Sequence, residues 1–148
     1  MPVDLERLAR WTFEDRICEY NARDTILYAL GVGCGAEPDD LNFVYEDKLV
    51  ALPSMVAVLG DPGFWLRDPS LGVIWQKILH GDQSILFYAP LLPQGVLLVR
   101  NRIERVENRG KGRGIFVTQS RTLHERETGE LVAELTATII LRGDGSGE

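Results

Sequence analysis

The chain has 148 residues, of which 45% are hydrophobic, and this content suits a single domain with a sizeable core. Its formal net charge of -6 and its pI near 5.0 argue against a nucleic-acid partner, because binding to phosphates favours a basic surface. No apolar run is long enough to span a bilayer, and the N-terminus lacks the basic-then-apolar order of a signal peptide. We therefore expect a cytoplasmic protein without a membrane partner.

The first predicted element is a short amphipathic helix. Asn21 suits the N-cap, Asp24 lies three residues further on, and Gly31 suits the position that ends the helix. Three apolar side chains fall on one side and should pack against a larger element: Ile26, Leu27 and Leu30. A linker is expected over residues 33–40, and the apolar run 41–45 predicts a short strand.

A second helix is predicted between Pro53, which suits a first helical turn, and Gly60, which closes it. The residues between them leave almost no polar face: Met55, Val56, Ala57, Val58 and Leu59. A helix that is apolar on all sides must be surrounded by other structure.

Five later segments have the composition of strands separated by turns: residues 73–79, 84–88, 96–107, 114–125 and 131–142. In the last strand apolar residues alternate with polar ones, as one buried face requires. The apolar residues are Ala133, Leu135, Ala137, Ile139 and Leu141. Ile115, Val117 and Leu123 suggest a similar inner face on its neighbour, and residues 126–130 supply the hairpin turn.

Together these elements predict an α+β hot-dog fold, in which a curved antiparallel sheet wraps a buried central helix. We expect one domain over residues 1–142 and a flexible C-terminal tail over residues 143–148, which has too few apolar groups to become ordered. Such a sheet leaves an edge strand that can pair with another sheet, so a homodimer or a heteromer is expected.

The two cysteines, Cys18 and Cys34, lack the spacing of metal ligands and are expected to be small buried thiols. No metal and no resident cofactor are expected.

The most distinctive group of polar residues is the run His80, Gly81, Asp82 and Gln83, at the point where a strand should bend. Histidine exchanges protons near neutral pH, so His80 and Asp82 are candidate catalytic groups, and His80, Gly81 and Gln83 are candidates for substrate binding. Hydrogen-bonded structural groups at a strand bend or a subunit contact would give the same pattern, and we favour that interpretation.

A Gly-rich loop over residues 108–114 carries three cations, Arg109, Lys111 and Arg113. Glycines let backbone N–H groups approach an anion, so the loop could bind the phosphates of a nucleotide. A solvated hairpin turn explains the same residues equally well.

Two further regions are candidates for a site. Glu46 follows an apolar run and could order the wall of an active site, although a solvated carboxylate is the simpler interpretation. The segment 61–71 contains Phe64, Trp65 and Leu66 and could form a flap over a ligand, or it could anchor a loop on the core.

Two stretches together resemble one family: Arg23-Asp24-Thr-Ile-Leu-Tyr-Ala-Leu-Gly-Val-Gly33 and Leu79-His80-Gly81-Asp82-Gln83. They are similar to the N-terminal half of (R)-specific enoyl-CoA hydratases of the MaoC-like, hydratase 2 type. In that family two hot-dog folds usually share one chain, and the catalytic Asp and His lie in the second half, in a Gly-Asp-x-Asn-Pro-x-His signature. The non-catalytic half of the relatives carries a similar His-Gly-Glu-Gln run, and a Tyr-Glu that matches Tyr45-Glu46.

These 148 residues lack that signature. The residue five positions before His80 is Trp75, the residue five positions before His124 is Gln119, and no proline follows an asparagine. The resemblance therefore implies a chain that binds acyl-CoA and shapes the acyl pocket, while a partner hot dog supplies the catalytic Asp and His. It implies a CoA thioester as substrate and either a second copy or a catalytic MaoC-like chain as partner.

Three alternatives stay open. A homo-oligomer could hydrate enoyl-CoA by itself with His80 and Asp82, or the chain could be a binding or assembly subunit without a catalytic partner. A hot-dog acyl-CoA thioesterase is less favoured, because many of those enzymes use a carboxylate on or beside the central helix, where residues 53–59 offer only Ser54 as a polar side chain.

Overall fold

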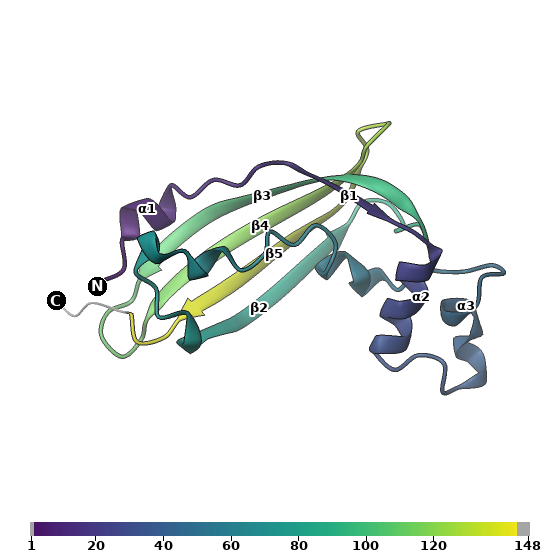
Figure 1. Cartoon of the computed structure of the whole chain (residues 1–148), viewed down its shortest axis with the longest axis horizontal. Helices are drawn as coiled ribbons and strands as arrows, with labels where there is room; N and C mark the ends of the chain where they lie inside the picture. The colour runs from purple at the N-terminus through teal and green to yellow at the C-terminus, as the bar shows by residue number, and fades with distance from the viewer. Residues whose placement is uncertain (1, 145–148) are drawn as a thin grey trace.

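The computed structural model describes residues 2–144, which form a five-stranded antiparallel sheet with short helices around it (Figure 1). The strands lie in the order β1-β3-β4-β5-β2, so β1 and β2 are the two edges. Their bounds are β1 Arg16–Tyr20, β2 Ile78–Phe87, β3 Gly95–Asn108, β4 Ile115–Glu125 and β5 Leu131–Leu141.

The three C-terminal strands agree with the sequence prediction. On β4, Ile115, Val117 and Leu123 are at most 1% exposed, because alternate side chains of a strand point to the same face. The turn over residues 126–130 joins β4 to β5, and Glu125 N–H donates to the carbonyl of Glu130 at 2.8 Å. We call the face that carries the buried β4 side chains the inner face.

The N-terminal half departs from the prediction in three places. Strand β1 was not predicted, and the segments expected as two strands over 73–79 and 84–88 contribute to one strand, β2. The run 41–45 forms a helix, α3 Leu41–Val44, instead of a strand. A short apolar run has no periodicity that separates the two structures, so its neighbours decide which one forms.

The predicted helix after Asn21 is confirmed as α2 Ala22–Gly31, and Asn21 and Asp24 cap it reciprocally. Its buried residues are Thr25 and Ala29, whereas Leu27 and Leu30 are half exposed, so the expected packing side was wrong in part. The Thr25 hydroxyl donates to the carbonyl of Pro93 at 2.7 Å, which attaches the helix beside one end of the sheet.

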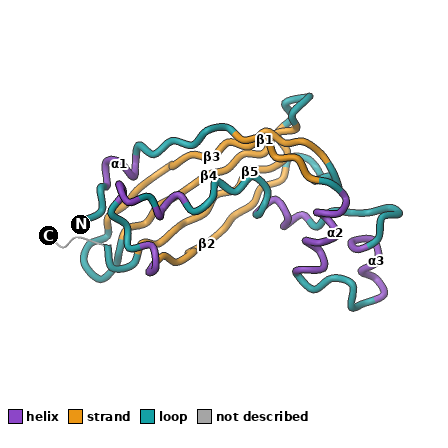
Figure 2. Tube along the Cα trace, in the orientation of Figure 1, coloured by secondary structure: helices purple, strands orange, loops and turns teal. Residues whose placement is uncertain are grey.

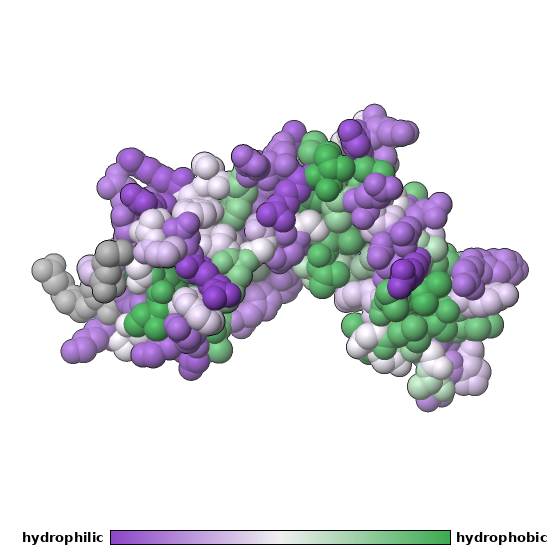
Figure 3. Space-filling model, in the orientation of Figure 1, coloured by the Kyte–Doolittle hydropathy of each residue, from purple (hydrophilic) through white to green (hydrophobic). Residues whose placement is uncertain are grey.

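Helices α2 and α3 make a separate lobe at the right of Figure 1, whereas α1 Leu5–Ala9 lies at the opposite end of the sheet. Apolar surface gathers over the α2–α3 lobe in Figure 3. The large exposed apolar residues of this part of the chain are Leu27, Leu30, Val32, Leu41 and Tyr45.

The expected central helix is much shorter than predicted. Residues 53–60 contain one 3-10 helix, η2 Pro53–Ala57, and Val58 just beyond it is 57% exposed, so this segment is not surrounded on all sides. Gly60 ends it with a φ of 65°, at a point where a Cβ atom would lie 2.5 Å from Val99 of β3. The chain must pass so close to the sheet there that a longer helix cannot continue.

The inner face is covered mainly by an irregular strap, which we define as residues 51–77. It runs in front of the sheet from η2 to the start of β2 (Figures 1 and 2). The strap contains three more 3-10 helices: η3 Trp65–Arg67, η4 Pro69–Leu71 and η5 Trp75–Lys77. A further one, η1 Pro38–Asp40, precedes α3.

Two groups of buried side chains hold the strap on the sheet. Met55 and Val56 pack with Leu97, Val99 and Leu123 near one end. A second group packs near the other end and consists of Leu8, Leu66, Leu71, Ile115, Val117 and Leu141.

Of the tail predicted over 143–148, residues 145–148 lie outside the described part of the chain. The Asp144 carboxylate accepts a hydrogen bond from the Ile74 N–H at 3.2 Å, and burial raises the pKa of this carboxyl. Cys18 and Cys34 are free thiols, as predicted, but each is only half-buried. Within residues 2–144, no helix has the length and apolar content needed to cross a membrane.

Candidate functional site

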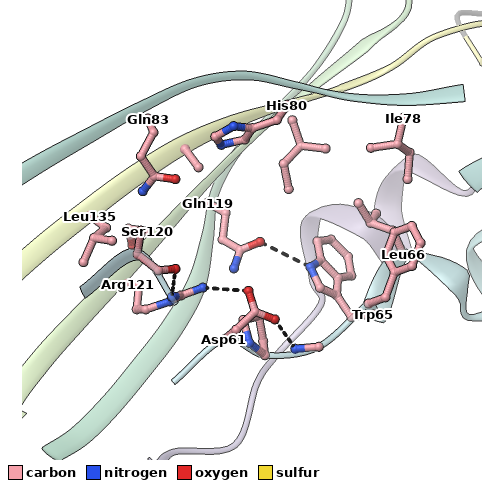
Figure 4. A pocket seen from close by; sticks show the side chains of 16 residues that line it. Asp61, Trp65, Leu66, Ile78, His80, Gln83, Gln119, Ser120, Arg121 and Leu135 are labelled. Carbon is pink, nitrogen blue, oxygen red and sulfur yellow. Dashed lines mark hydrogen bonds and ion pairs between the residues drawn. The ribbon is translucent and has the colours of Figure 1, made fainter. Parts of the chain in front are cut away.

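A cavity of about 210 Å³ lies between the inner face of the sheet and the strap (Figure 4). Strands β2, β4 and β5 supply one side, and strap residues 57–66 supply the other. Most of the lining is apolar, and the polar residues that line the cavity are Asp61, His80, Gln83, Gln119, Ser120 and Arg121. A largely apolar cavity with a few polar groups is the usual form of a site for a small organic ligand.

Strand β2 brings His80 and Gln83 to this cavity through a β-bulge. The pairing register with β5 shifts between His80 and Asp82, as the predicted bend at Gly81 requires. Side chains three apart in a regular strand face opposite ways, but one extra residue returns them to the same face. His80 and Gln83 accordingly both line the cavity (Figure 4).

The other two residues of the run hold the bulge in place. A Cβ atom on Gly81 would lie 3.0 Å from the carbonyl oxygen of Thr138 and 3.1 Å from Cδ1 of Ile140, so only glycine fits without a shift. The Asp82 carboxylate accepts a hydrogen bond from the Thr138 N–H at 3.2 Å. Asp82 satisfies a backbone donor beside the bulge and is not part of the cavity lining.

Arg121 fastens the strap to the sheet. Its side chain is 11% exposed, and its Nη1 donates to the carbonyls of Ala57 and Leu59, each at 3.0 Å. Its Nε donates to Asn101 Oδ1 at 3.1 Å, and its Nη2 to Asp61 Oδ2 at 3.2 Å. Burial lowers the pKa of Arg121, and the Asp61 carboxylate opposes that shift. The guanidinium therefore sets where the strap runs along this side of the cavity.

Aromatic side chains make the opposite wall. Trp65 Nε1 donates to Gln119 Oε1 at 3.2 Å, and the Trp65 ring lies 5.5 Å from the ring of Trp11 and 5.3 Å from that of Phe13. Phe64 also lines the cavity. The segment 61–71 was predicted either as a flap or as an anchor on the core. Trp65 has features of both, because it packs against Trp11 and Phe13 and also lines the cavity.

The remaining predicted site residues lie away from this cavity. Glu46 is exposed and does not line it. Arg109, Lys111 and Arg113 are exposed in the hairpin loop between β3 and β4, with the Arg109 guanidinium 3.8 Å from the centroid of the Phe116 ring. The structure brings together His80, Gln83, Phe64 and Trp65, and leaves Glu46 and the loop cations outside.

The sequence matches the MFE-2 hydratase 2 N-terminal domain family over residues 18–143. The chain belongs to this family. The resemblance noted from the runs around Asp24 and His80 is thereby confirmed.

Two curated relatives are consistent with this family assignment. 3-Hydroxyacyl-thioester dehydratase Y of Mycobacterium tuberculosis is 35% identical over 149 residues, covering 98% of this chain and 50% of the relative. Peroxisomal enoyl-CoA hydratase 2 of Arabidopsis thaliana is 35% identical over 143 residues, covering 85% of this chain and 43% of the relative. The chain spans about half the length of the curated relatives it matches.

Solved structures support the same fold for the hydratase 2 domain. A MaoC-like dehydratase from Phytophthora capsici has a TM-score of 0.74 and 24% identity, over 99% of this chain and 52% of that one. The HadBC (3R-hydroxyacyl-ACP dehydratase) complex of Mycobacterium tuberculosis has a TM-score of 0.59 and 21% identity, over 88% of this chain and 98% of that one. These neighbours are hot-dog proteins, so the predicted fold family is confirmed, although a central helix buried on all sides over 53–60 is not.

Sequence reasoning missed Arg121, Gln119 and Asn101. The signal was present on β4, where every second residue from Ile115 to Leu123 faces inward and two of these inward positions are polar. A buried polar pair that interrupts an apolar face needs partners across the core. Those partners are on the strap, and no local pattern connects the strap to β4.

Proposed function

We propose that this chain is the non-catalytic hot-dog half of an (R)-specific trans-2-enoyl-CoA hydratase, or 3-hydroxyacyl-CoA dehydratase. It binds the acyl chain of a CoA thioester, and a partner hot dog supplies the catalytic Asp and His. The observation that carries the proposal is the largely apolar cavity beneath the strap, in a domain of the hydratase 2 N-terminal family. The missing Asp-x-Asn-Pro-x-His signature in these 148 residues supports the division of roles.

In the proposed reaction, water adds across the double bond of the trans-2-enoyl thioester. The partner's Asp and His would activate the water, and the apolar cavity would hold the acyl chain in line with them. The acidic side chain among the residues that line the cavity is Asp61. Its carboxylate already accepts hydrogen bonds from Arg121 and from the Gly63 N–H, so it is not placed to act as a catalytic base. We infer that His80 contributes to the wall of the acyl site and does not transfer a proton.

The edge strand β2 is the surface we propose for the partner. Among the strands of the described residues, β2 pairs only with β5, so its other side is open. Leu79 and Leu86 on this strand are exposed apolar residues. An open edge with apolar side chains favours pairing with another sheet, either of a second copy or of a catalytic hot dog.

The β3–β4 loop is our candidate for contact with the CoA phosphates. Ile115, the residue that follows the loop, pairs with Leu141, and Leu141 also pairs with Ile78 at the start of β2. The loop therefore flanks the end of the sheet at which β2 begins, two residues before His80. Lys111 and Arg113 are exposed there, whereas Arg109 lies against Phe116 and 3.6 Å from Glu107.

A domain exchange tests the proposal. This chain would replace the matching half of dehydratase Y of M. tuberculosis, and hydration of a medium-chain trans-2-enoyl-CoA would be followed by loss of the conjugated thioester absorbance. We expect turnover by the hybrid and none by this chain alone or by the other half alone. A folded hybrid without turnover would contradict the proposal.

The same assay separates the competing assignments. Turnover by this chain alone, in proportion to its concentration, would mean that it is a self-sufficient homo-oligomer. Release of free CoA from a saturated acyl-CoA would instead indicate a thioesterase.

A further inference from the structure

We propose that the acyl chain bound in this cavity carries a hydroxyl or carbonyl oxygen beyond its third carbon, and that Gln83 and His80 recognise it. The inference rests on the proposed function, since it assumes that the cavity receives the acyl chain of a CoA thioester. It goes further, because it specifies a substrate class: oxygenated acyl chains in preference to plain alkyl chains.

The polar groups of the cavity fall into two sets. In the first set, hydrogen bonds within the protein already occupy Arg121, Asp61, Gln119 and Ser120. The first three hold the strap on the sheet, and the Ser120 hydroxyl donates to the Glu104 carboxylate. In the second set, the exposed side chains of Gln83 and His80 line the cavity, and neither forms a hydrogen bond to any of residues 2–144. Only the second set is available to a ligand.

Both available side chains come from the same strand and the same face. The bulge at Gly81 is what turns Gln83 toward the cavity together with His80, and Gly81 and Asp82 hold that bulge through Thr138. Two of the four residues in the run thus fix a geometry whose effect is to present an amide and an imidazole to the cavity (Figure 4).

Their chemistry selects the ligand. The Gln83 amide has both a donor and an acceptor, and a neutral His80 ring has one of each, so either can pair with a hydroxyl, and either can donate to a carbonyl. An alkyl chain that covered these two exposed side chains would displace their water and leave them without partners, which lowers affinity by up to about tenfold for each group. An oxygenated chain of the same length would avoid that loss.

The size of the cavity sets the length of the chain. An engineered apolar cavity of about 150 Å³ accepts a benzene ring. The cavity here has a volume of about 210 Å³, which suits a chain somewhat longer than six carbons.

Binding without turnover tests the inference. Isothermal titration calorimetry would measure the affinities of octanoyl-CoA and of a series of hydroxyoctanoyl-CoAs. In this series the hydroxyl moves from the middle to the end of the acyl group. Both the protein alone and the hybrid enzyme would be titrated. Saturated thioesters are not hydrated, so the result does not depend on catalysis. We expect at least one member of the series to bind about tenfold tighter than octanoyl-CoA.

Gln83→Met keeps the approximate length of the side chain and removes the amide, so the preference should fall at least threefold. Gln94→Met makes the same change at an exposed residue outside the cavity and should keep the preference. Circular dichroism spectra would show that both variants fold. Octanoyl-CoA binding as tightly as every hydroxylated ligand, or a preference that survives Gln83→Met, would overturn the inference, as would a lack of binding by all of the ligands.

The two proposals fail separately. If the hybrid hydrates enoyl-CoA but shows no preference for hydroxylated chains, only the substrate class is wrong. If this chain prefers hydroxylated ligands and the hybrid has no turnover, only the assignment as a hydratase half is wrong.

Discussion

His80 and Gln83 lie three residues apart in β2 and yet face the same cavity, because the bulge at Gly81 places one extra residue between them. We predict that Gly81→Ala will lower the free energy of unfolding by about 1–3 kcal/mol, since its Cβ would meet backbone and side-chain atoms of β5. Urea unfolding followed by circular dichroism measures the change. Gly31→Ala is the matched control: no atom lies within 4 Å of its added Cβ, so stability should not fall.

Arg121 should be among the most sensitive side chains in the protein. Arg121→Met leaves the carbonyls of Ala57 and Leu59 without their donor, so we expect a loss of about 2–4 kcal/mol in the free energy of unfolding. Asp61→Asn should cost less than about 1 kcal/mol, because the Asp61 side chain is 61% exposed. Arg126→Met alters an exposed arginine and serves as control; a loss equal to that of Arg121→Met would refute the role of the buried guanidinium.

The raised pKa of Tyr20 leads us to predict that the free energy of unfolding falls at alkaline pH. Its hydroxyl donates to the carbonyl of Leu92 at 2.7 Å, and burial raises its pKa from 10.0 to about 12. The folded state thus holds this proton more tightly than the unfolded state. The stability that results is complete below pH 10 and is lost as the pH rises through about 12, amounting to about 3 kcal/mol.

Urea unfolding would measure this effect at a series of pH values between 9 and 12, which is roughly the range in which the proton is released. Tyr20→Phe should flatten the fall, at the cost of about 1 kcal/mol near neutral pH for the lost hydrogen bond. Tyr88→Phe, at an exposed tyrosine, should leave the fall unchanged. An identical pH dependence in all three proteins would exclude Tyr20 as its source.

The β3–β4 loop gives a salt-dependent prediction. If Lys111 and Arg113 meet the CoA phosphates, the double change Lys111→Gln and Arg113→Gln should weaken binding of octanoyl-CoA by about three- to tenfold at low salt and much less at high salt. Calorimetry at the two salt concentrations tests this. The pair Arg23→Gln and Lys48→Gln, on the α2–α3 lobe, is a charge-matched control, and equal effects of the two pairs would favour a plain hairpin turn.

The two edge strands predict an asymmetry in assembly. Leu86 on β2 is 56% exposed and Ile17 on β1 is 52% exposed, so both can be replaced by glutamate without burying a charge. We expect Leu86→Glu to weaken association with a second hot dog at least tenfold, and Ile17→Glu to leave it intact. Light scattering after gel filtration measures both, and dissociation by Ile17→Glu alone would move the interface to β1.

The sequence predicted best where a local pattern repeats. Strands β4 and β5 followed from alternation over long segments, β3 followed from strand composition between turns, and α2 followed from the pairing of Asn21 with Asp24. It failed at 41–45, where a few apolar residues fit a strand and a helix equally well. At 53–60 it predicted a helix surrounded on all sides, whereas a 3-10 helix forms over 53–57 and Val58 is exposed. For the site, the run from His80 to Gln83 was recognised as important, but a pattern alone did not separate the residues that face the cavity from those that hold the bulge.

The family, the class of fold and the absence of the catalytic signature from these 148 residues could all be inferred from the amino-acid sequence, because they depend on residue identity and spacing along the chain. The irregular strap over the inner face could be recognised only in three dimensions. The same holds for Arg121, which binds the strap carbonyls of Ala57 and Leu59 and also Asn101 of β3. The two contacts with the strap carbonyls join residues about sixty positions apart. Their geometry depends on how closely the chain passes β3 at Gly60, a steric condition that no local pattern records.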